Sequence, residues 1–530
     1  MSVRLQNLWR VRAQWLAPFF LVILAAIPRF IALENLPPDA LNQDEAVDLY
    51  DAYSILRTGR DHRGNFLPLH LAAFSDVRDN RTPLFTYASV PAAALFGLRP
   101  LAVRVVSAAT GVATVLLVYA IALRLFKDRR AALAAGVFLA LSPWHIFLSR
   151  AGFEPITVPF FLALGTWFFL HALDGNRRAW YGAAIAFAVG MYAYAPVKVA
   201  IPLWMFFLLA AFRNEIRVHR LPIFRAAFLF LLMVAPFAVD HILHWEAVQG
   251  RYNEVSVFTY GKPWPLYFLA NYASHFSAVF TNPRSLSLAE AIGFIFGIVA
   301  LITARRESQM ARRLLFGWLV IAPLPAAMTS ISPHTLRSAA ILPAFAIVEA
   351  IGFLFALRMA RALPRRIVVP AFAALLFLIA ARDANFYVSS GFPFTISTFH
   401  ARGYQSMSAF LREHGAAYRR IVVITDREKY SYLQPYIFFL VYLQYDPKIF
   451  HDGPVQRIYD ELGWQHVTSF GRFMFCDLPR CLERTEATLF IAPRAIAENV
   501  PNSRIVFSNA YLSAFTVGAV ALTATGEPAD

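Results

Sequence analysis

The strongest constraint on the fold of this chain is the repetition of long apolar segments along it. Of its 530 residues, 58% are hydrophobic and 15% are charged, which is more apolar surface than a soluble domain hides. A helix of about 20 mainly apolar residues is long enough to cross the hydrocarbon core of a bilayer. The sequence therefore predicts a polytopic α-helical membrane protein, with the lipid bilayer as a partner.

About eleven segments have the hydropathy of spanning helices, several of them short. They are Gln14–Leu33, Leu101–Phe126, Ala131–Ser149, Pro155–Leu173, Trp180–Val197, Val199–Phe212, Ala226–Val239, Leu288–Thr303, Leu314–Met328, Leu336–Leu357 and Ile367–Ala381. With this alternation, the clusters of Arg and Lys in the short loops all fall on one side, as the positive-inside rule demands. We therefore expect a cytoplasmic N-terminus. The net charge of +16 reflects this topology and does not indicate nucleic-acid binding.

The segments between the expected spans are of two kinds. Residues 34–100 form a polar outer loop in which Pro83–Phe96, apolar but short for a span, is expected to lie at the interface or to re-enter the membrane. Residues 240–287 are expected to form a second long outer loop, rich in Trp, Tyr and His. The transmembrane domain is expected to cover residues 1–382.

Residues 383–530 are less apolar and show mixed periodicity. Tyr404–His414 is expected to form a helix, and Arg420–Thr425, Thr488–Ile491 and Arg504–Phe507 are expected to form strands. The sequence thus predicts a small α/β domain on the non-cytoplasmic side.

The two cysteines, Cys476 and Cys481, both lie in this C-terminal domain. A non-cytoplasmic compartment is oxidising, so the two residues either pair as a disulfide or remain as thiols. Their spacing does not suit zinc.

An acidic pair, Asp44 and Glu45, opens the first outer loop about ten residues after the first span, and isolated carboxylates are costly near a bilayer. One interpretation is structural: both are helix N-terminal carboxylates stabilised by the helix dipole. The other is catalytic, because a carboxylate can take a proton from an acceptor hydroxyl.

Positively charged residues recur in the other outer turns. These candidates to hold a phosphate group are Arg81, Arg150, Lys198, His334 and Arg337, since charge-assisted bonds stabilise an anion that develops during reaction. Structural alternatives remain for each kind of residue. Arg81 could snorkel to the interface, Arg150 could pair with Glu154, and a lone histidine is more often structural.

Glu154, Tyr192, Tyr194 and His275 are the candidates to contact substrate, although aromatic belts also place tyrosines at this depth. Asp240, His241, His244 and Glu246 have a spacing that suits one helix face. A divalent metal there is conceivable, but we assign no metal site and expect no required cofactor.

Taken in order, these motifs resemble the GT-C superfamily, and within it glycosyltransferase family 39, which includes protein mannosyltransferases and enzymes of the lipid A aminoarabinose transferase type. The similarity is carried by the acidic pair after the first span and by the motifs that follow it. They are Arg81-Thr82-Pro83-Leu84-Phe85, Phe96-Gly97…Val103-Arg104-Val105-Val106-Ser107, Ser149-Arg150…Glu154, Tyr192-Ala193-Tyr194 and His334-Thr335-Leu336-Arg337 ahead of Pro343. The family favours Lys where this chain has Arg81, and Arg binds phosphate through a planar fork instead of a point charge. The resemblance covers residues 14–380 and leaves the C-terminal domain outside its strongest part.

The resemblance implies an inverting transfer of a sugar from undecaprenyl phosphate or another polyprenyl-phosphate carrier to a glycan, lipid or protein acceptor. Asp44 would orient or deprotonate the acceptor, Glu45 would support it, and the outer cations would hold the phosphate. The short loops and the Ala-rich composition favour a bacterium, so we expect an inner-membrane protein with a periplasmic C-terminal domain. A flippase for a lipid-linked glycan is the alternative, although no internal repeat typical of transporters is apparent. An enzyme of related fold that uses no lipid phosphate is a third possibility.

Overall fold

The structure is a computed structural model that describes most of the chain. The described residues are 3–35, 41–72, 74–75, 81–259, 263–281, 288–303, 309–359, 402–425, 434–461, 463–477 and 487–517, with isolated positions between 364 and 381. The expected span Ile367–Ala381 and the expected domain boundary near residue 383 fall largely outside them.

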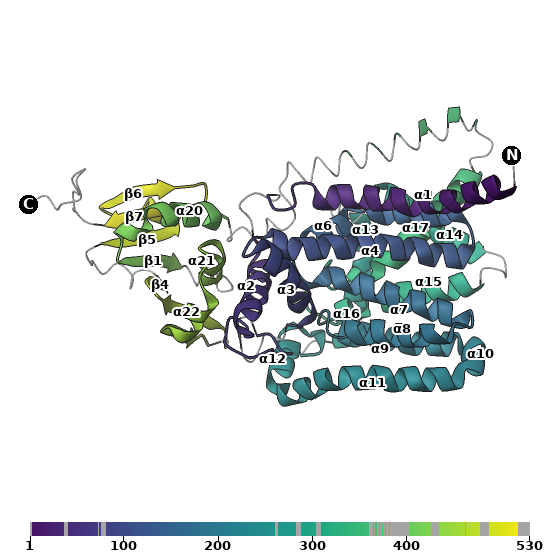
Figure 1. Ribbon diagram of the computed structural model, residues 1–530, viewed down its shortest axis with the longest axis horizontal. Coiled ribbons are helices and arrows are strands. Elements are labelled where there is room, and N and C mark those ends of the chain that lie inside the picture. Colours follow the sequence, from purple (N-terminus) through teal and green to yellow (C-terminus); the bar gives the residue numbers. More distant parts are fainter. Residues whose placement is uncertain are drawn as a thin grey trace, which may run out of the picture.

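The larger part of the molecule is a bundle of helices whose axes run nearly side by side (Figure 1). Its helices are α1 Val3–Phe30, α4 Leu101–Phe126, α5 Arg129–Leu141, α6 Pro143–Arg150, α7 Thr157–Leu173, α8 Arg177–Gly190, α9 Val197–Ala211, α11 Arg220–Leu243, α13 Trp264–Thr281, α14 Leu288–Thr303, α15 Gln309–Ile321, α16 Leu324–Ala327 and α17 Leu342–Met359. By length and hydropathy, five of the described helices are able to cross a membrane, or six if the bent pair α5 and α6 is one span, and shorter apolar helices lie among them.

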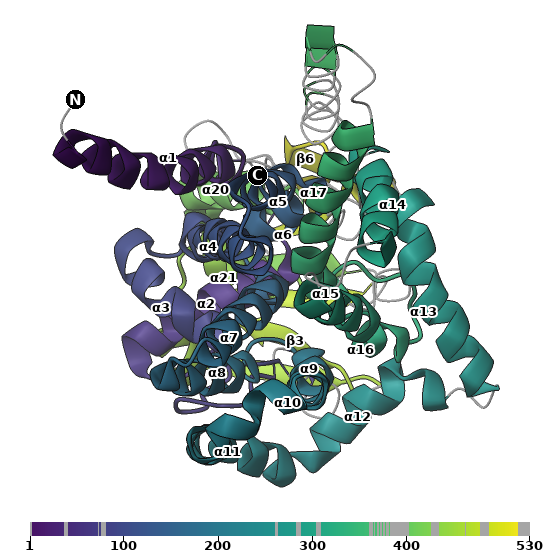
Figure 2. The same cartoon turned by 90° about the vertical axis from the view of Figure 1, so that its right-hand side faces the viewer.

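Burial differs sharply between the helices of the bundle. Viewed from its end, α17, α15, α4 and α7 lie toward the middle, whereas α1, α11 and α13 lie at the periphery (Figure 2). In the segment formed by α17 and the turn before it, 67% of the most apolar 18-residue stretch is buried inside the protein. In the segment that contains α11, the corresponding share is 11%. The exposed leucines and phenylalanines of α11 are therefore suited to contact lipid.

Short elements close the two ends of the bundle. At one end lie α2 Gln43–Thr58, α3 Leu84–Phe96, α12 Trp245–Val255 and the 3-10 turns η1 Glu154–Ile156, η3 Val257–Thr259 and η5 Ala339–Ile341. At the opposite end lies the short helix α10 Arg213–Ile216, which the 3-10 turn η2 Arg217–His219 follows directly in the chain (Figure 1). The end that carries α2 is called the outer end below.

The expected span Ala131–Ser149 is broken in the structure. It forms α5 and α6, which meet at a bend of 58°, with Pro143 in the first turn of α6. Proline has no N–H to continue the hydrogen-bond ladder of α5, but it is well suited to begin a new helix.

The expectation that residues 240–287 form a long loop is wrong for the part that the structure describes. This segment contains α12 and α13. In α13, Asn271, Ser274 and His275 lie three and four residues apart, hence on one face. They bond to the segment 327–334, for example through Asn271 Nδ2 to the Thr329 carbonyl at 2.8 Å. Because these polar residues interrupt the apolar run, the hydropathy pattern did not reveal the helix.

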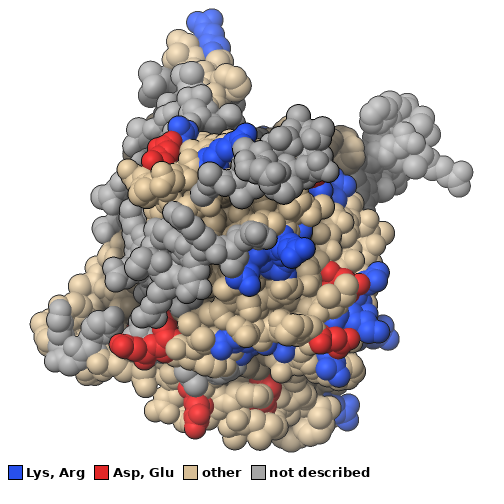
Figure 3. All heavy atoms as spheres, turned by 90° about the vertical axis from the view of Figure 1, so that its left-hand side faces the viewer, with Lys and Arg blue, Asp and Glu red and all other residues tan. Residues whose placement is uncertain are grey.

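The C-terminal domain contains a seven-stranded sheet in the order β2-β3-β4-β1-β5-β7-β6. Its elements are α20 Tyr404–His414, η8 Gly415–Ala417, β1 Arg420–Thr425, α21 Tyr436–Tyr442, α22 Pro447–Asp452, β2 Val455–Tyr459, β3 Gln465–Phe470, β4 Phe473–Asp477, β5 Thr488–Pro493, α23 Arg494–Ala497, β6 Ser503–Ser508 and β7 Leu512–Val517. The predicted helix and strands in this domain are therefore confirmed. The outer face of the domain carries interspersed basic and acidic side chains (Figure 3).

The central strand β1 is covered on both faces of the sheet. It pairs in parallel with β4 and β5, with Ile421 opposite Phe473 on one side and Leu489 on the other. Its residues from Ile421 to Ile424 are all buried, the continuous apolar run expected of a parallel strand covered on both sides. Residues of α20 and α21 join the core on one face, and α23 joins it on the other.

The C-terminal domain packs directly on α2. The Tyr50 hydroxyl of α2 donates to the Tyr445 carbonyl at 3.0 Å, and its ring meets Phe450 edge-on at 6.3 Å between centroids. The Gln434 amide donates to the Gln43 side chain at 2.8 Å. Helix α2 is therefore enclosed between the bundle and this domain.

A glycine sets the closest helix crossing. At Gly352 in α17, a Cβ atom would collide with the backbone of Gly293 and Gly297 in α14. We expect Gly352→Val to lower the free energy of unfolding by about 1–3 kcal/mol, because the two backbones would have to separate. Thermal unfolding of the detergent-solubilised protein measures this effect. Ala227→Val adds methyl groups on the exposed face of α11 and should leave the midpoint unchanged; equal midpoints for the two variants would contradict the close crossing.

Candidate active site

Helix α2 presents a face of three carboxylates at the outer end of the bundle. Asp44, Asp48 and Asp51 are spaced by four and three residues, so they lie on one side of the helix. The helix begins in a capping box, in which the Asn42 side chain accepts from the Asp44 amide at 3.1 Å. Asp44 is exposed in this first turn, whereas Asp48 and Asp51 are buried.

Arg81 lies at the centre of this acidic face. Its guanidinium pairs with Asp48, lies 3.6 Å from Glu154 Oε1 through Nε, and lies 4.0 Å from Asp51 Oδ2 through Nη1. Its side chain is 10% exposed. The backbone of Arg81 forms a two-way bridge with Leu71, at 3.1 and 3.3 Å. Two candidates from distant parts of the sequence, Arg81 and Glu154, thus come together.

The two buried aspartates of α2 differ in their protonation. Burial raises the pKa of Asp48 to about 6, although Arg81 and the hydrogen bond from the Thr86 hydroxyl (2.6 Å) counteract this. Burial acts in the same direction on Asp51, but the charge and hydrogen bonds of His62, together with Arg81, lower its pKa below the ordinary value. Asp51 is therefore the firmly ionised member of the pair, and Asp48 is the one that titrates near neutral pH.

Glu45 is fully engaged in holding neighbouring elements together. Its carboxylate accepts from Arg104 of α4 at 3.0 and 3.2 Å, from the Gly152 amide at 2.7 Å and from the Asn42 amide at 2.9 Å. The carboxylate therefore ties the start of α2 to α4 and to the turn before η1. This arrangement matches the structural interpretation of the acidic pair for Glu45.

Arg150 binds backbone oxygens at the end of α1. Its guanidinium donates to the Pro28 carbonyl at 2.8 Å and to the Ile31 carbonyl at 2.9 Å. Next to it, the buried Arg29 donates to His145 Nδ1 at 2.7 Å. The last carbonyls of a helix lack intrahelical donors, and a cation there also suits the helix dipole. Of the two alternatives left open for Arg150, the pairing with Glu154 is not the arrangement found, since Glu154 lies 3.6 Å from Arg81.

Lys198 and the two tyrosines lie beside α11. The Lys198 ammonium stands 5.4 Å from the Phe237 ring centroid and interacts electrostatically with Asp240. The Tyr192 hydroxyl donates to the Met233 carbonyl at 2.7 Å, and its own carbonyl accepts from the amide of Leu84, three residues after Arg81, at 3.1 Å. Tyr194 packs against the bundle core.

The His334–Arg337 turn is held by α13. The His334 amide donates to His275 Nε2 at 3.3 Å, while His275 Nδ1 donates to the Asn271 carbonyl at 2.7 Å. The Arg337 amide in turn approaches His334 Nδ1 at 3.4 Å. Trp144 of α6 donates to the Thr335 carbonyl at 3.1 Å. The turn therefore lies against the same part of the outer end as the 151–154 turn.

Four functional candidates were not singled out by sequence reasoning: Asp48, Asp51, His62 and Arg104. For the first two, the signal was present as the four- and three-residue spacing from Asp44, which places all three on one helix face. His62 and Arg104 show no such local spacing. His62 reaches its partner Asp51 through the turn after α2, and Arg104 reaches its partner Glu45 from a different helix, α4.

The histidines suggested for a metal bond to the backbone of their own helix. His241 and His244 donate through Nδ1 to carbonyls of their own helix, at 3.0 and 2.9 Å, and the His244 ring stacks on His70. Within the described residues, no group of three or more His, Cys, Asp or Glu is arranged to hold a metal ion. Cys476 is disulfide-bonded, but Cys481 lies outside the described residues, so the pairing stays a prediction.

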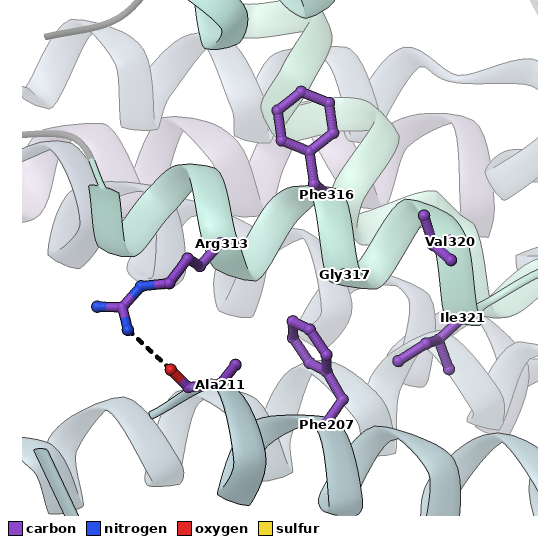
Figure 4. Close-up of a pocket in the computed structure, with 7 residues that line it drawn as sticks. All are labelled: Phe207, Ala211, Arg313, Phe316, Gly317, Val320 and Ile321. Atoms are coloured by element: carbon purple, nitrogen blue, oxygen red, sulfur yellow. Dashed lines mark hydrogen bonds between the residues drawn. The ribbon is translucent and has the colours of Figure 1, made fainter. Parts of the chain in front are cut away.

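A groove elsewhere in the bundle is apolar. It lies between the second half of α9 and most of the length of α15, and the Arg313 end of the groove is next to α10. Its lining residues are Phe207, Ala211, Arg313, Phe316, Gly317, Val320 and Ile321 (Figure 4). Its one charged residue, Arg313, donates to the Ala211 carbonyl at 2.7 Å and pairs with Glu215. This groove lacks the acid and base groups of the outer end.

Comparisons with known proteins show a family match and a fold similarity. Residues 80–239 match the family described as dolichyl-phosphate-mannose-protein mannosyltransferase. The fold is similar to that of ArnT from Cupriavidus metallidurans in the apo state, with 13% identity and a TM-score of 0.56 over 95% of this chain and 98% of that one. The structure of ArnT bound to undecaprenyl phosphate matches with 12% identity and a TM-score of 0.56 over 94% and 97%. A search of the curated proteins found no match.

The pair formed by Glu45 and Arg104 gives a test of how the site is held. We expect Glu45→Gln to reduce the free energy of unfolding by roughly 3–5 kcal/mol, because it leaves a buried guanidinium without its counter-charge. The unfolding midpoint in detergent measures this change, and adding Arg104→Met should restore part of it.

Glu34→Gln is the matched control for this prediction. Glu34 pairs with Arg99 through Nε at 2.8 Å, but that pair is open to solvent, where ion pairs contribute little. A midpoint that falls as much for Glu34→Gln as for Glu45→Gln would contradict the role of burial.

Proposed function

We propose that this chain, a member of the GT-C superfamily of membrane glycosyltransferases, transfers a sugar from a polyprenyl-phosphate carrier to an acceptor at the outer end of the bundle. One observation carries the proposal: Arg81, nearly buried, stands among carboxylates of α2 and η1 where the outer turns meet. The family match includes this residue. The fold likeness to a protein whose structure holds undecaprenyl phosphate also supports it.

The proposed orientation places the outer end in the periplasm of a bacterial inner membrane. Helix α10 and the turn η2, which carry Arg213 and Arg217, lie at the other end (Figure 1), and the positive-inside rule favours the cytoplasm for such basic connections. The C-terminal domain, which packs on α2, is then periplasmic, and the disulfide at Cys476 suits that compartment.

Arg81 is the proposed contact for the donor phosphate. In the structure it is neutralised by Asp48 and approached by Glu154 and Asp51, so a phosphate must displace a carboxylate to bind. The raised pKa of Asp48 eases this exchange, because a protonated Asp48 holds the guanidinium less firmly. The planar fork of Arg81 can then bind two phosphate oxygens together.

Asp44 is the proposed base. It is exposed at the first turn of α2 and acts electrostatically on both Asp48 and Glu154, so it lies beside the Arg81 cluster. The acceptor oxygen attacks the anomeric carbon and forms the new glycosidic bond, while the bond from that carbon to the phosphate oxygen breaks. The acceptor proton passes to Asp44 and the electron pair leaves with polyprenyl phosphate, whose negative charge Arg81 stabilises. The anomeric centre inverts.

The remaining candidates take supporting roles in this proposal. Glu154 positions Arg81, and Lys198, His334 and Arg337 provide further cations for the phosphate or the carrier. Tyr192, Tyr194 and His275 contact the sugar or acceptor. Glu45 and Arg150 are instead assigned to positioning, because their polar atoms hold backbone and ion-pair contacts. A lipid-linked glycan flippase is not favoured, because the matched family consists of transferases.

The central test uses protein reconstituted into membranes with labelled polyprenyl-phosphate sugars. We expect Asp44→Asn to reduce the rate of transfer by roughly 10²- to 10⁴-fold, the usual contribution of a general base, while donor binding persists. Asp174→Asn, which alters an exposed carboxylate paired with Arg124, should transfer normally. Undiminished transfer by Asp44→Asn would remove this residue from catalysis, and export of label without transfer would support the flippase.

The pH dependence of donor binding tests the role of Asp48. The Asp48 carboxyl is neutral below its pKa of about 6 and negative above it. The ionised carboxylate competes with a phosphate for Arg81 and repels it, so ionisation of Asp48 weakens phosphate binding. We expect affinity for the phosphodiester donor, which has a constant charge, to fall by up to about tenfold between about pH 5 and 7. Asp48→Asn should abolish this dependence. A profile that keeps its slope in the variant would assign the titration to another group.

A further inference from the structure

A chain of buried polar contacts joins the C-terminal domain to Arg81. It runs from Tyr436 of α21 to His62, from His62 to Asp51 of α2, and from Asp51 toward Arg81. The Tyr436 hydroxyl lies 3.3 Å from His62 Nε2, and His62 Nδ1 lies 2.6 Å from Asp51 Oδ1. Tyr436, His62 and Asp51 are each at most 3% exposed, although Tyr436 lies 374 residues after His62 in the sequence.

The chemistry of the contacts sets their direction. The ionised Asp51 carboxylate can only accept, so the proton of this hydrogen bond is on His62 Nδ1. The backbone amide of His62 donates to the same carboxylate oxygen, Asp51 Oδ1, at 2.8 Å. The other ring nitrogen, Nε2, meets the Tyr436 hydroxyl, which can donate to this nitrogen or accept from it. A histidine ring whose far nitrogen is bonded keeps one tautomer and one orientation.

His62 also determines how tightly Asp51 holds Arg81. Both contacts from His62 fall on Asp51 Oδ1, and the other oxygen, Oδ2, stays 4.0 Å from Arg81 Nη1. Asp48, by contrast, is in direct contact with the guanidinium. If His62 loosened its hold, Asp51 could close on Arg81 as a second tight carboxylate, and a phosphate would then compete less well for Arg81.

Other contacts keep the C-terminal domain in place against α2 and the turn after it. His451 Nε2 donates to the Asp61 carbonyl at 2.8 Å, and the Gln465 amide donates to the Phe74 carbonyl at 2.7 Å. The domain cannot shift relative to α2 without breaking these bonds, so the Tyr436 hydroxyl is presented to His62 from a fixed position.

We propose that the C-terminal domain sets the position of Arg81 through this chain, and that Tyr436 and His62 are positioning residues for donor binding. This inference rests on the proposed function, because it takes Arg81 as the contact for the donor phosphate. It assigns the domain a direct part in the affinity for the lipid phosphate, in addition to any part in acceptor binding.

The first experiment compares two Tyr→Phe variants of the full-length protein in membranes. Tyr436→Phe removes only the hydroxyl that reaches His62. Tyr404→Phe makes the same change at another buried tyrosine of the domain, whose ring stacks on Phe438. We expect Tyr436→Phe to raise the donor KM by about three- to tenfold, the range that one buried hydrogen bond supports, with kcat and the acceptor KM little changed. Tyr404→Phe should leave the donor KM at the wild-type value.

A second variant tests whether the effect passes through His62. His62→Asn retains a side-chain donor near Asp51 but is too short to reach Tyr436. It should raise the donor KM as Tyr436→Phe does, and the double variant should be no worse than either single one, because both cut the same chain. An unchanged donor KM in folded Tyr436→Phe, an equal rise in Tyr404→Phe, or additive effects in the double variant would each overturn the inference.

Binding of undecaprenyl phosphate to the same variants separates this inference from the proposed function. If the wild type binds this lipid but transfers no sugar from any polyprenyl-phosphate donor, the proposed function fails. The inference is then still decided by whether Tyr436→Phe, and not Tyr404→Phe, weakens binding of the lipid by a similar factor.

Discussion

The outer end of this protein depends on the burial of charge around α2. Two arginines, Arg81 and Arg104, lie against carboxylates of that helix, and both side chains are nearly shielded from solvent. Removing ions from water is costly, and the cost is recovered only when each ion has a partner with good geometry. The pairs of Arg104 with Glu45 and of Arg81 with Asp48 therefore determine where α2 can lie relative to the bundle.

The two arginine pairs serve different purposes. Arg104 and Glu45 are closed on all sides, with further bonds to backbone amides, which is the pattern of a structural anchor. Around Arg81, burial raises the pKa of two carboxyl groups, to about 6 for Asp48 and to about 8 for Glu154. Asp51 accepts from His62 and lies 4.0 Å from the guanidinium. A cation whose carboxyl neighbours are readily protonated is suited to exchange a protein carboxylate for a bound anion.

The C-terminal domain also belongs to this arrangement. Helix α2 has the acidic face toward Arg81 and carries Tyr50, which contacts the domain. A short amphipathic helix has little stability by itself in water. Packing against the bundle on one side and the C-terminal domain on the other stabilises α2. The same enclosure lets the domain reach the site through His62, so the two parts of the chain act on one cluster.

The sequence by itself determined the multi-pass membrane character, the short helix that ends at Phe96 and the helix and strands of the C-terminal domain, because these follow from hydropathy and local periodicity. It also placed Asp44, Arg81 and Glu154 among the candidates. Only the tertiary structure decided that Arg150 holds the end of α1, that Glu45 holds Arg104, that Asp48 and Asp51 lie at Arg81, and that His62 binds Asp51. Those roles depend on partners many residues away, and a side chain's charge does not reveal which distant backbone or carboxylate it will meet when it is buried.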